Sequence, residues 1–227
     1  PPHLIEAVER AMRDGHNGYT PAAGIWSARE AVAAEFESRG ATISPDRIVL
    51  TSGASEAIEL ALNVLVDQGD EVLVPVPAYP FYTAVLSQLG ARAVYYRADP
   101  ARGWEPDLSH LRSLIGPKTR SLVVIDPNNP TGAVYQQETR LALLELADRH
   151  NFVLLSDEGY TELAYDGPVA PIGVPNPDAP VISFASLSKA WLAPGWRAGW
   201  LATSAPGRLD AVLAAIKDLA DGRLCSN

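Results

Sequence analysis

The feature that most constrains the fold of this chain is a regular alternation of short apolar runs and helix-like segments. The apolar runs are rich in Val, Ile and Leu and cover Arg47–Thr51, Glu71–Pro75, Arg92–Arg97, Ser121–Asp126, Phe152–Asp157, Val181–Phe184 and Ala198–Thr203. Helical patterns separate most of them, at Ala54–Val66, Tyr79–Leu89, Asp107–Leu114 and Gln136–His150, with Ser27–Arg39 ahead of the first run. Continuous apolar runs are typical of strands buried on both faces, and intervening helices supply the crossovers between parallel strands.

This pattern predicts an α/β fold of three layers, with an open, mostly parallel sheet of seven strands and helices on both faces. Because no helix precedes the seventh strand, we expect that strand to be able to run antiparallel. Further helices are expected at Leu209–Ala220 and from Pro2 onwards. With 227 residues, the chain is long enough for one large domain with a buried core.

Composition and charge argue against several classes of function. Hydrophobic residues make up 47% and charged residues 20% of the chain, as in ordinary globular proteins. The net charge of −9 disfavours nucleic acid or an anionic membrane as the main partner. Cys225 is the only cysteine, so no internal disulfide can form, and no apolar run is long enough to span a bilayer. We therefore expect a cytoplasmic location.

Residues 183–199 read SFASLSKAWLAPGWRAG and carry the first indication of chemistry. A lysine at the edge of an apolar pocket loses its proton more readily and can attack a carbonyl to give a Schiff base, which is the role considered for Lys189. Arg197 offers a planar fork that suits a phosphate. Together the two residues point to an aldehyde cofactor that carries a phosphate, namely pyridoxal phosphate. Taken alone, the stretch also fits a surface lysine and a structural arginine beside a Pro-Gly turn.

Other polar segments follow the predicted strands at their carboxyl ends, where open parallel sheets bind ligands. Residues 51–55 (TSGAS) open a helix, so they form either an anion site at a helix N-terminus or a simple N-cap. Residues 126–132 (DPNNPTG) form either a plain turn or a loop whose Asn amide donates to a cofactor oxygen.

Asp157 and Tyr79 complete the set of candidate residues. Asp157 ends a strongly apolar strand, where a charged group needs a partner. A protonated pyridine nitrogen is one such partner, and a cap or a salt bridge is the alternative. Tyr79 follows the second strand and either stacks on a flat ring or belongs to the core.

In these motifs the chain resembles the class I/II aminotransferases, which are fold type I pyridoxal-phosphate enzymes. The motifs TSGASEA, PVPAYP, DPNNPTG, SDEGY and SLSKAWLAPGWRAGW occur in the family's order, and the resemblance extends from Tyr19 to the helix after Thr203. It implies that residues 1–227 are the family's large, cofactor-binding domain, in a homodimer with shared active sites. It also implies a cis Asn129–Pro130 bond, because the family's Asn-Pro bond in this loop is often cis.

The resemblance implies a role for each candidate residue. Lys189 is expected to bond the cofactor aldehyde and to carry a proton between substrate Cα and cofactor C4′. Asp157 is expected to pair with the pyridine nitrogen. The ring is expected to meet Tyr79 on its face and both Asn129 and Tyr160 at its phenolic oxygen. The phosphate is expected to be held by Gly53, Ala54, Ser55, Ser186 and Arg197, and by Tyr19 of the neighbouring subunit. Lys189, Asp157 and Tyr160 form the expected catalytic group, and no metal ligand is expected.

Three functions remain open on these residues. The favoured one is transamination between an amino acid and a 2-oxo acid, with alanine and 2-oxoglutarate preferred. A carbon–sulfur lyase or other eliminating enzyme uses the same domain, and so does the effector domain of a transcription regulator with a helix-turn-helix upstream of Pro1. The family's N-terminal segment and small C-terminal domain, with its carboxylate-binding arginine, find no match here. We therefore expect the sequence to be a piece of a longer polypeptide.

Overall fold

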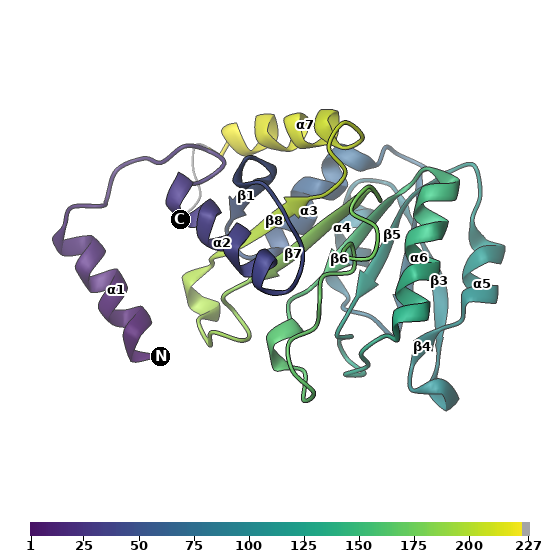
Figure 1. Ribbon diagram of the computed structural model, residues 1–227. Helices are drawn as coiled ribbons and strands as arrows, with labels where there is room; N and C mark the ends of the chain where they lie inside the picture. Colours follow the sequence, from purple (N-terminus) through teal and green to yellow (C-terminus); the bar gives the residue numbers. More distant parts are fainter. Residues whose placement is uncertain (224–227) are drawn as a thin grey trace.

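An eight-stranded sheet forms the centre of the fold, with strands in the order β1-β8-β7-β6-β5-β2-β3-β4 (Figure 1). The computed structural model describes residues 1–223, so Cys225 lies outside the described part of the chain. The strands are β1 (Ile48–Thr51), β2 (Glu71–Val76), β3 (Arg92–Asp99), β4 (Glu105–Pro106), β5 (Thr119–Ile125), β6 (Val153–Asp157), β7 (Val181–Ser186) and β8 (Gly199–Thr203).

The sheet is mostly parallel, as predicted. Strand β8 runs antiparallel to both β1 and β7, which confirms the expectation for the last strand. The predicted number of seven strands is one too low, because β4 also pairs, antiparallel to β3. This strand contains only Glu105 and Pro106, which is too short to appear as an apolar run in the sequence.

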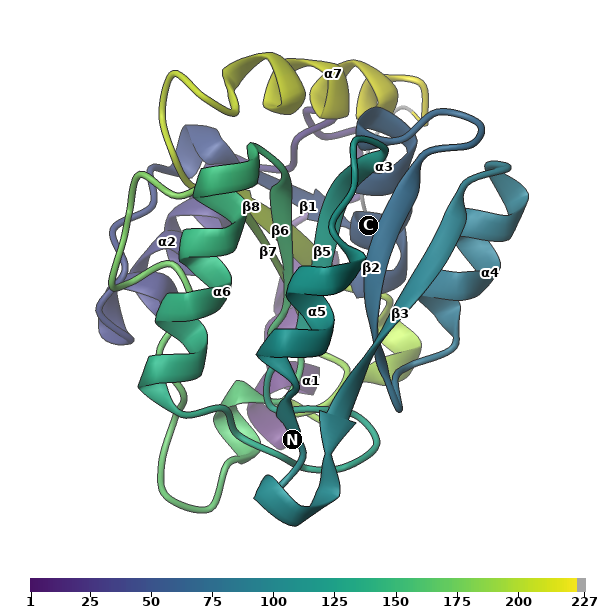
Figure 2. The same ribbon diagram turned by 90° about the vertical axis from the view of Figure 1, so that its right-hand side faces the viewer.

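Helices cover both faces of the sheet (Figures 1 and 2). Helices α3 (Ala54–Leu65), α4 (Phe81–Gln88) and α7 (Asp210–Asp221) pack on one face, and α2 (Trp26–Ser38), α5 (Leu108–Leu114) and α6 (Gln137–His150) pack on the other. The ends of these helices lie within two residues of the predicted ones. Short 3-10 turns occur at Pro45–Arg47, Pro100–Arg102, Thr161–Leu163 and Pro194–Trp196. Across residues 1–223 no helix is long and apolar enough to cross a membrane.

Helix α1 (Pro2–Arg13) stands apart from the sheet (Figure 1). None of its residues is buried, although Ile5, Val8 and Met12 lie on one side of the helix at helical spacing. The ring of His3 meets the ring of Trp191 at 6.3 Å, edge to face. An amphipathic helix of this kind normally buries its apolar side, so this helix presents a surface that the described residues leave uncovered.

Candidate active site

A pocket of about 180 Å³ lies at the carboxyl ends of the parallel strands. Nine of the predicted site residues line it, and these are Ala54, Ser55, Tyr79, Asn129, Asp157, Tyr160, Ser186, Lys189 and Arg197. Four further lining residues were not predicted from the sequence, and these are Ile58, Gly159, Ser188 and Pro194. Loops that are far apart in the sequence therefore meet at one point, as expected for an open parallel sheet.

One end of the pocket is formed by the start of α3 and the side chain of Arg197. Among the described residues no side chain caps this helix N-terminus, and Gly53 precedes it with a φ of 81°. A Cβ on Gly53 would lie 2.2 Å from Nη2 of Arg197, so only glycine allows the guanidinium this close. The guanidinium donates to the carbonyls of Ser52 (3.2 Å) and Pro194 (2.9 Å). A helix N-terminus beside an arginine is well suited to bind a phosphate.

Strand β8 fits equally closely against this end of the pocket. A Cβ on Gly199, the first residue of β8, would lie 2.6 Å from the carbonyl carbon of Gly53. Ser186, the last residue of β7, pairs with Gly199 in the sheet and accepts a hydrogen bond at Oγ from the Ser188 amide (3.3 Å). The two glycines thus allow the strand and the helix to meet without an intervening side chain.

Asp157 lines the pocket at the point where β6 ends. Its Oδ2 accepts a hydrogen bond from the hydroxyl of Tyr82 (3.0 Å) and its Oδ1 accepts one from the Gly159 amide (3.3 Å). Burial raises the pKa of Asp157, because the ionised carboxyl loses its water. A cation in the pocket would offset that cost. Tyr82 was not predicted as a site residue, since an aromatic side chain on an apolar helix is typical of the core.

The two asparagines of the loop after β5 have different roles. Asn128 is buried and accepts hydrogen bonds at Oδ1 from the Thr131 amide (3.3 Å) and hydroxyl (2.9 Å), so it stabilises the turn. Asn129 faces the pocket and donates to the Tyr160 hydroxyl at 3.4 Å. The amide and the phenol therefore converge on one place, where they can bind the same ligand oxygen. The Asn129–Pro130 bond is cis, as predicted.

Lys189 lies in the turn that follows β7. Its Nζ is 5.6 Å from the centroid of the Tyr160 ring. From the sequence, this lysine is expected at the edge of an apolar pocket. The structure instead leaves Lys189 exposed at a pocket whose lining is polar and apolar in about equal parts. Tyr79, which is 37% exposed, stacks on Phe81 with ring centroids 6.0 Å apart and borders the same pocket.

Two predicted residues do not line the pocket. Gly53 precedes the lining residue Ala54 and allows the close approach of the Arg197 guanidinium, as described above. Tyr19 is 85% exposed, and its contact with the phosphate in a neighbouring subunit stays a prediction.

The residues present fit a flat, phosphorylated ring. The pocket is lined by an arginine at a helix N-terminus, a carboxylate, an Asn–Tyr pair and a lysine close to that tyrosine. The cradle that a Cβ on Gly53 would fill supports this fit most directly. Among residues 1–223 no group of three or more His, Cys, Asp or Glu side chains is arranged to hold a metal ion.

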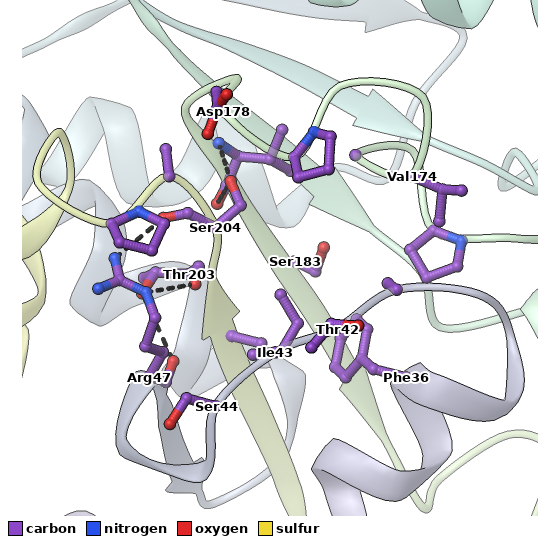
Figure 3. A pocket seen from close by; sticks show the side chains of 18 of the residues that line it. Phe36, Thr42, Ile43, Ser44, Arg47, Val174, Asp178, Ser183, Thr203 and Ser204 are labelled. Carbon is purple, nitrogen blue, oxygen red and sulfur yellow. Dashed lines mark hydrogen bonds between the residues drawn. The ribbon is translucent and has the colours of Figure 1, made fainter.

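A second pocket, of about 430 Å³, lies at the other edge of the sheet, where β1 and β7 begin (Figure 3). Its lining is mainly apolar, with Phe36 on one side and Arg47 on the other, and Ser183 at its base (Figure 3). None of the predicted site residues borders it. The chemistry of the chain therefore gathers at one edge of the sheet.

The chain is similar to known proteins over its whole length. It matches the family "Aminotransferase class I and II" over residues 1–227. It is 38% identical to "Glutamate-pyruvate aminotransferase AlaA" of Escherichia coli, covering 92% of this chain and 53% of that protein. It is 40% identical to "Alanine aminotransferase" of Mycobacterium tuberculosis, covering 100% of this chain and 55% of that protein. The chain thus spans about half the length of these curated relatives.

Solved structures give the same result. The alanine aminotransferase of Pyrococcus furiosus superposes with a TM-score of 0.97 at 37% identity, covering 100% of this chain and 58% of that one. An aspartate aminotransferase of Thermus thermophilus superposes with a TM-score of 0.92 at 35% identity, again covering 100% and 58%.

Proposed function

We propose, since the chain belongs to the class I and II aminotransferase family, that the whole protein transfers an amino group between an amino acid and a 2-oxo acid. Members of this family use pyridoxal phosphate as their cofactor. The observation that carries the proposal is the pocket at the carboxyl ends of the strands, which joins Lys189, Asp157 and the phosphate cradle within one small volume. When bound, pyridoxal phosphate supplies an electron sink for the electron pair released at substrate Cα.

The chain's own residues would hold the cofactor at three places. Arg197 and the start of α3 would bind its phosphate, with Ser55 and Ser186 as further donors. Asp157 would face the ring nitrogen, and its carboxylate would keep that nitrogen protonated. Asn129 and Tyr160 would donate to the phenolic oxygen. The contact between Asn129 and Tyr160 supports this last assignment, because it shows that both polar groups reach the same point.

Lys189 would carry out the proton transfer. Its amine would hold the cofactor through the aldehyde and, once freed by the incoming substrate amine, would take the proton from substrate Cα and return it at cofactor C4′. The position of Nζ beside the Tyr160 ring supports this role, since it places the amine at the side of the pocket where the phenolic oxygen is expected. The carboxylate of Asp157 acts through charge alone, and no proton needs to leave it.

Alanine, glutamate and their 2-oxo acids are the proposed substrates. The names of two relatives, glutamate-pyruvate aminotransferase and alanine aminotransferase, support this choice over an eliminating enzyme. The same names favour an enzyme over the effector domain of a regulator.

The remaining expectations concern the rest of the protein. Residues 1–227 would be its cofactor-binding domain, and an arginine outside them would bind the substrate carboxylate. The active form would be a homodimer in which Tyr19 reaches the phosphate in the neighbouring subunit; the exposure of Tyr19 and of the apolar side of α1 supports such a contact. The expected cytoplasmic location rests on the single cysteine of the sequence and stays a prediction.

The test is a coupled assay of the full-length protein with L-alanine, run with and without 2-oxoglutarate. Transamination predicts pyruvate in proportion to glutamate, and no more than one pyruvate per active site when the 2-oxo acid is omitted. A parallel assay uses L-cystathionine, which carries a sulfur leaving group that alanine lacks; continuous formation of pyruvate, ammonia and homocysteine from it without 2-oxoglutarate would instead identify an eliminating enzyme.

A further inference from the structure

Arg39 and Glu158 form an ion pair that is almost completely buried. Their side chains are 3% and 2% exposed, and Arg39 Nη1 lies 3.1 Å from Glu158 Oε2. Charged groups are rarely buried this deeply, because the loss of water costs more than most ion pairs regain. An apolar pair would join α2 to the sheet at lower cost. A buried pair at this position therefore needs a reason beyond stability.

The carboxylate of Glu158 accepts hydrogen bonds at both of its oxygens. Oε1 accepts hydrogen bonds from the hydroxyls of Ser156 (3.0 Å) and Ser183 (2.7 Å), and Oε2 accepts the bond from Arg39. The Glu158 amide donates to the carbonyl of Phe184 (2.8 Å). Glu158 is thus fixed to β6, to β7 and to the end of α2 at the same time.

Arg39 holds the later part of the same loop. Besides Glu158, its Nη1 donates to the carbonyl of Val169 (3.3 Å), and the Val169 amide in turn donates to the carbonyl of Thr161 (3.2 Å). The guanidinium also pairs with Glu35 of α2, with Nε 2.7 Å from Oε1. Arg39 therefore balances two carboxylates and secures the loop of residues 158–169 at both ends.

Asp157 and Tyr160, which are close to Glu158 in the sequence, line the pocket. Successive residues at a strand end point to opposite faces of the sheet. Asp157 accordingly meets Tyr82 of α4 on one face, whereas Glu158 meets Arg39 on the other. Tyr160 follows two positions later and lines the pocket. Any movement of Glu158 would move both of these pocket residues.

On this geometry we propose that Arg39 and Glu158 are positioning residues, which hold Asp157 and Tyr160 in place against the cofactor ring. The proposal rests on the proposed function, because it presumes that a ring binds in this pocket. It assigns to Glu158, the third residue of the SDEGY motif, a role that differs from that of Asp157. Asp157 interacts with the ring, and Glu158 fixes the direction from which it does so.

The test uses the full-length protein loaded with pyridoxal phosphate. Pyridoxal phosphate is achiral, so its visible circular dichroism arises only from fixed, asymmetric surroundings and reports how firmly the ring is oriented. Arg39→Met should lower the visible circular dichroism per bound cofactor and lower kcat by about tenfold or more, with little change in KM. Arg39→Lys restores a cation opposite Glu158 and should recover much of both signals.

The matched control is Arg29→Met, which removes an arginine from the same helix. Arg29 donates to the carbonyl of Pro45 (3.3 Å) and lies over the Trp26 ring, away from the loop. This variant should keep the visible circular dichroism and should keep kcat within about twofold of the wild type. Ser183→Ala serves if Arg39→Met does not fold, because it removes one hydrogen bond to Glu158 and should lower both signals by about threefold.

Three outcomes contradict the proposal, and they distinguish its failure from that of the proposed function. If the wild type binds the cofactor and a folded Arg39→Met variant keeps the wild-type dichroism and kcat, the positioning role alone is overturned. An unchanged Ser183→Ala variant would do the same where Arg39→Met does not fold. A wild type that binds no pyridoxal phosphate would overturn the proposed function, and the positioning role with it.

Discussion

At the scale of single residues, the site depends on a buried acid whose surroundings disfavour its charge. Asp157 has two hydrogen-bond donors, Tyr82 and Gly159, and burial raises its pKa. Both donors belong to the protein whether or not a ligand is bound. The charge of Lys189 also favours ionisation, and in the proposed function a cationic ring nitrogen would add to it. The charge of this carboxylate is therefore the property that the proposed chemistry needs most.

Replacing Asp157 tests this view. Asp157→Asn keeps the shape of the side chain but removes the negative charge, so kcat of the full-length protein should fall by about a hundredfold or more. Asp157→Glu should lose less, because it keeps the charge with poorer geometry. Steady-state kinetics with alanine and 2-oxoglutarate measure both variants. Near-normal turnover of Asp157→Asn would show that the acid is structural and that the ring lies elsewhere.

At the scale of elements, the start of α3 and the start of β8 meet where the proposed function places the cofactor phosphate. Gly53→Ala should weaken binding of pyridoxal phosphate by about tenfold or more, because its Cβ would displace the Arg197 guanidinium. Gly69→Ala is the control, since Gly69 also has a positive φ (86°) but a Cβ there meets nothing within 4 Å. Equilibrium dialysis gives both dissociation constants. Equal effects of the two substitutions would mean that backbone strain alone accounts for the loss.

Most elements could be predicted from the sequence, because continuous apolar runs and amphipathic periods leave few alternatives. Strand β4 could not, since two residues carry no period. The roles of loop residues were hard to predict for a different reason. A turn motif does not indicate which of its polar side chains points into the pocket. Asn128 and Asn129 are adjacent and chemically identical, and before the structure only the family resemblance assigned Asn129 rather than Asn128 to the site. Tyr82, Arg39 and Glu158 act through partners distant in sequence, which no local pattern indicates.

At the scale of the whole molecule, one buried carboxyl group should make stability depend on pH. Burial raises the pKa of Asp126 from 3.8 to about 6, even though its Oδ2 lies 2.6 Å from Arg140 Nη2. The folded state then binds this proton more tightly than the unfolded state does. The stabilising contribution is therefore fully present below pH 4 and is lost as the pH rises through about 6, a change of about 3 kcal/mol.

Urea unfolding of the wild type and of Asp126→Asn between pH 4 and pH 7 measures this contribution. The asparagine does not titrate, so the free energy of unfolding of the wild type, relative to the variant, should decrease by up to about 3 kcal/mol across the interval. Parallel curves would contradict the prediction and would mean that Arg140 keeps Asp126 ionised throughout.

The account of the molecule as a whole rests on one covalent assignment, the attachment of pyridoxal phosphate to Lys189. Borohydride treatment of the cofactor-loaded full-length protein, followed by peptide mass spectrometry, tests it most directly. A pyridoxyl group is predicted on Lys189 and on neither Lys118 nor Lys217, which lie outside the pocket. Absence of the label, or a label on a different lysine, would contradict the proposed site.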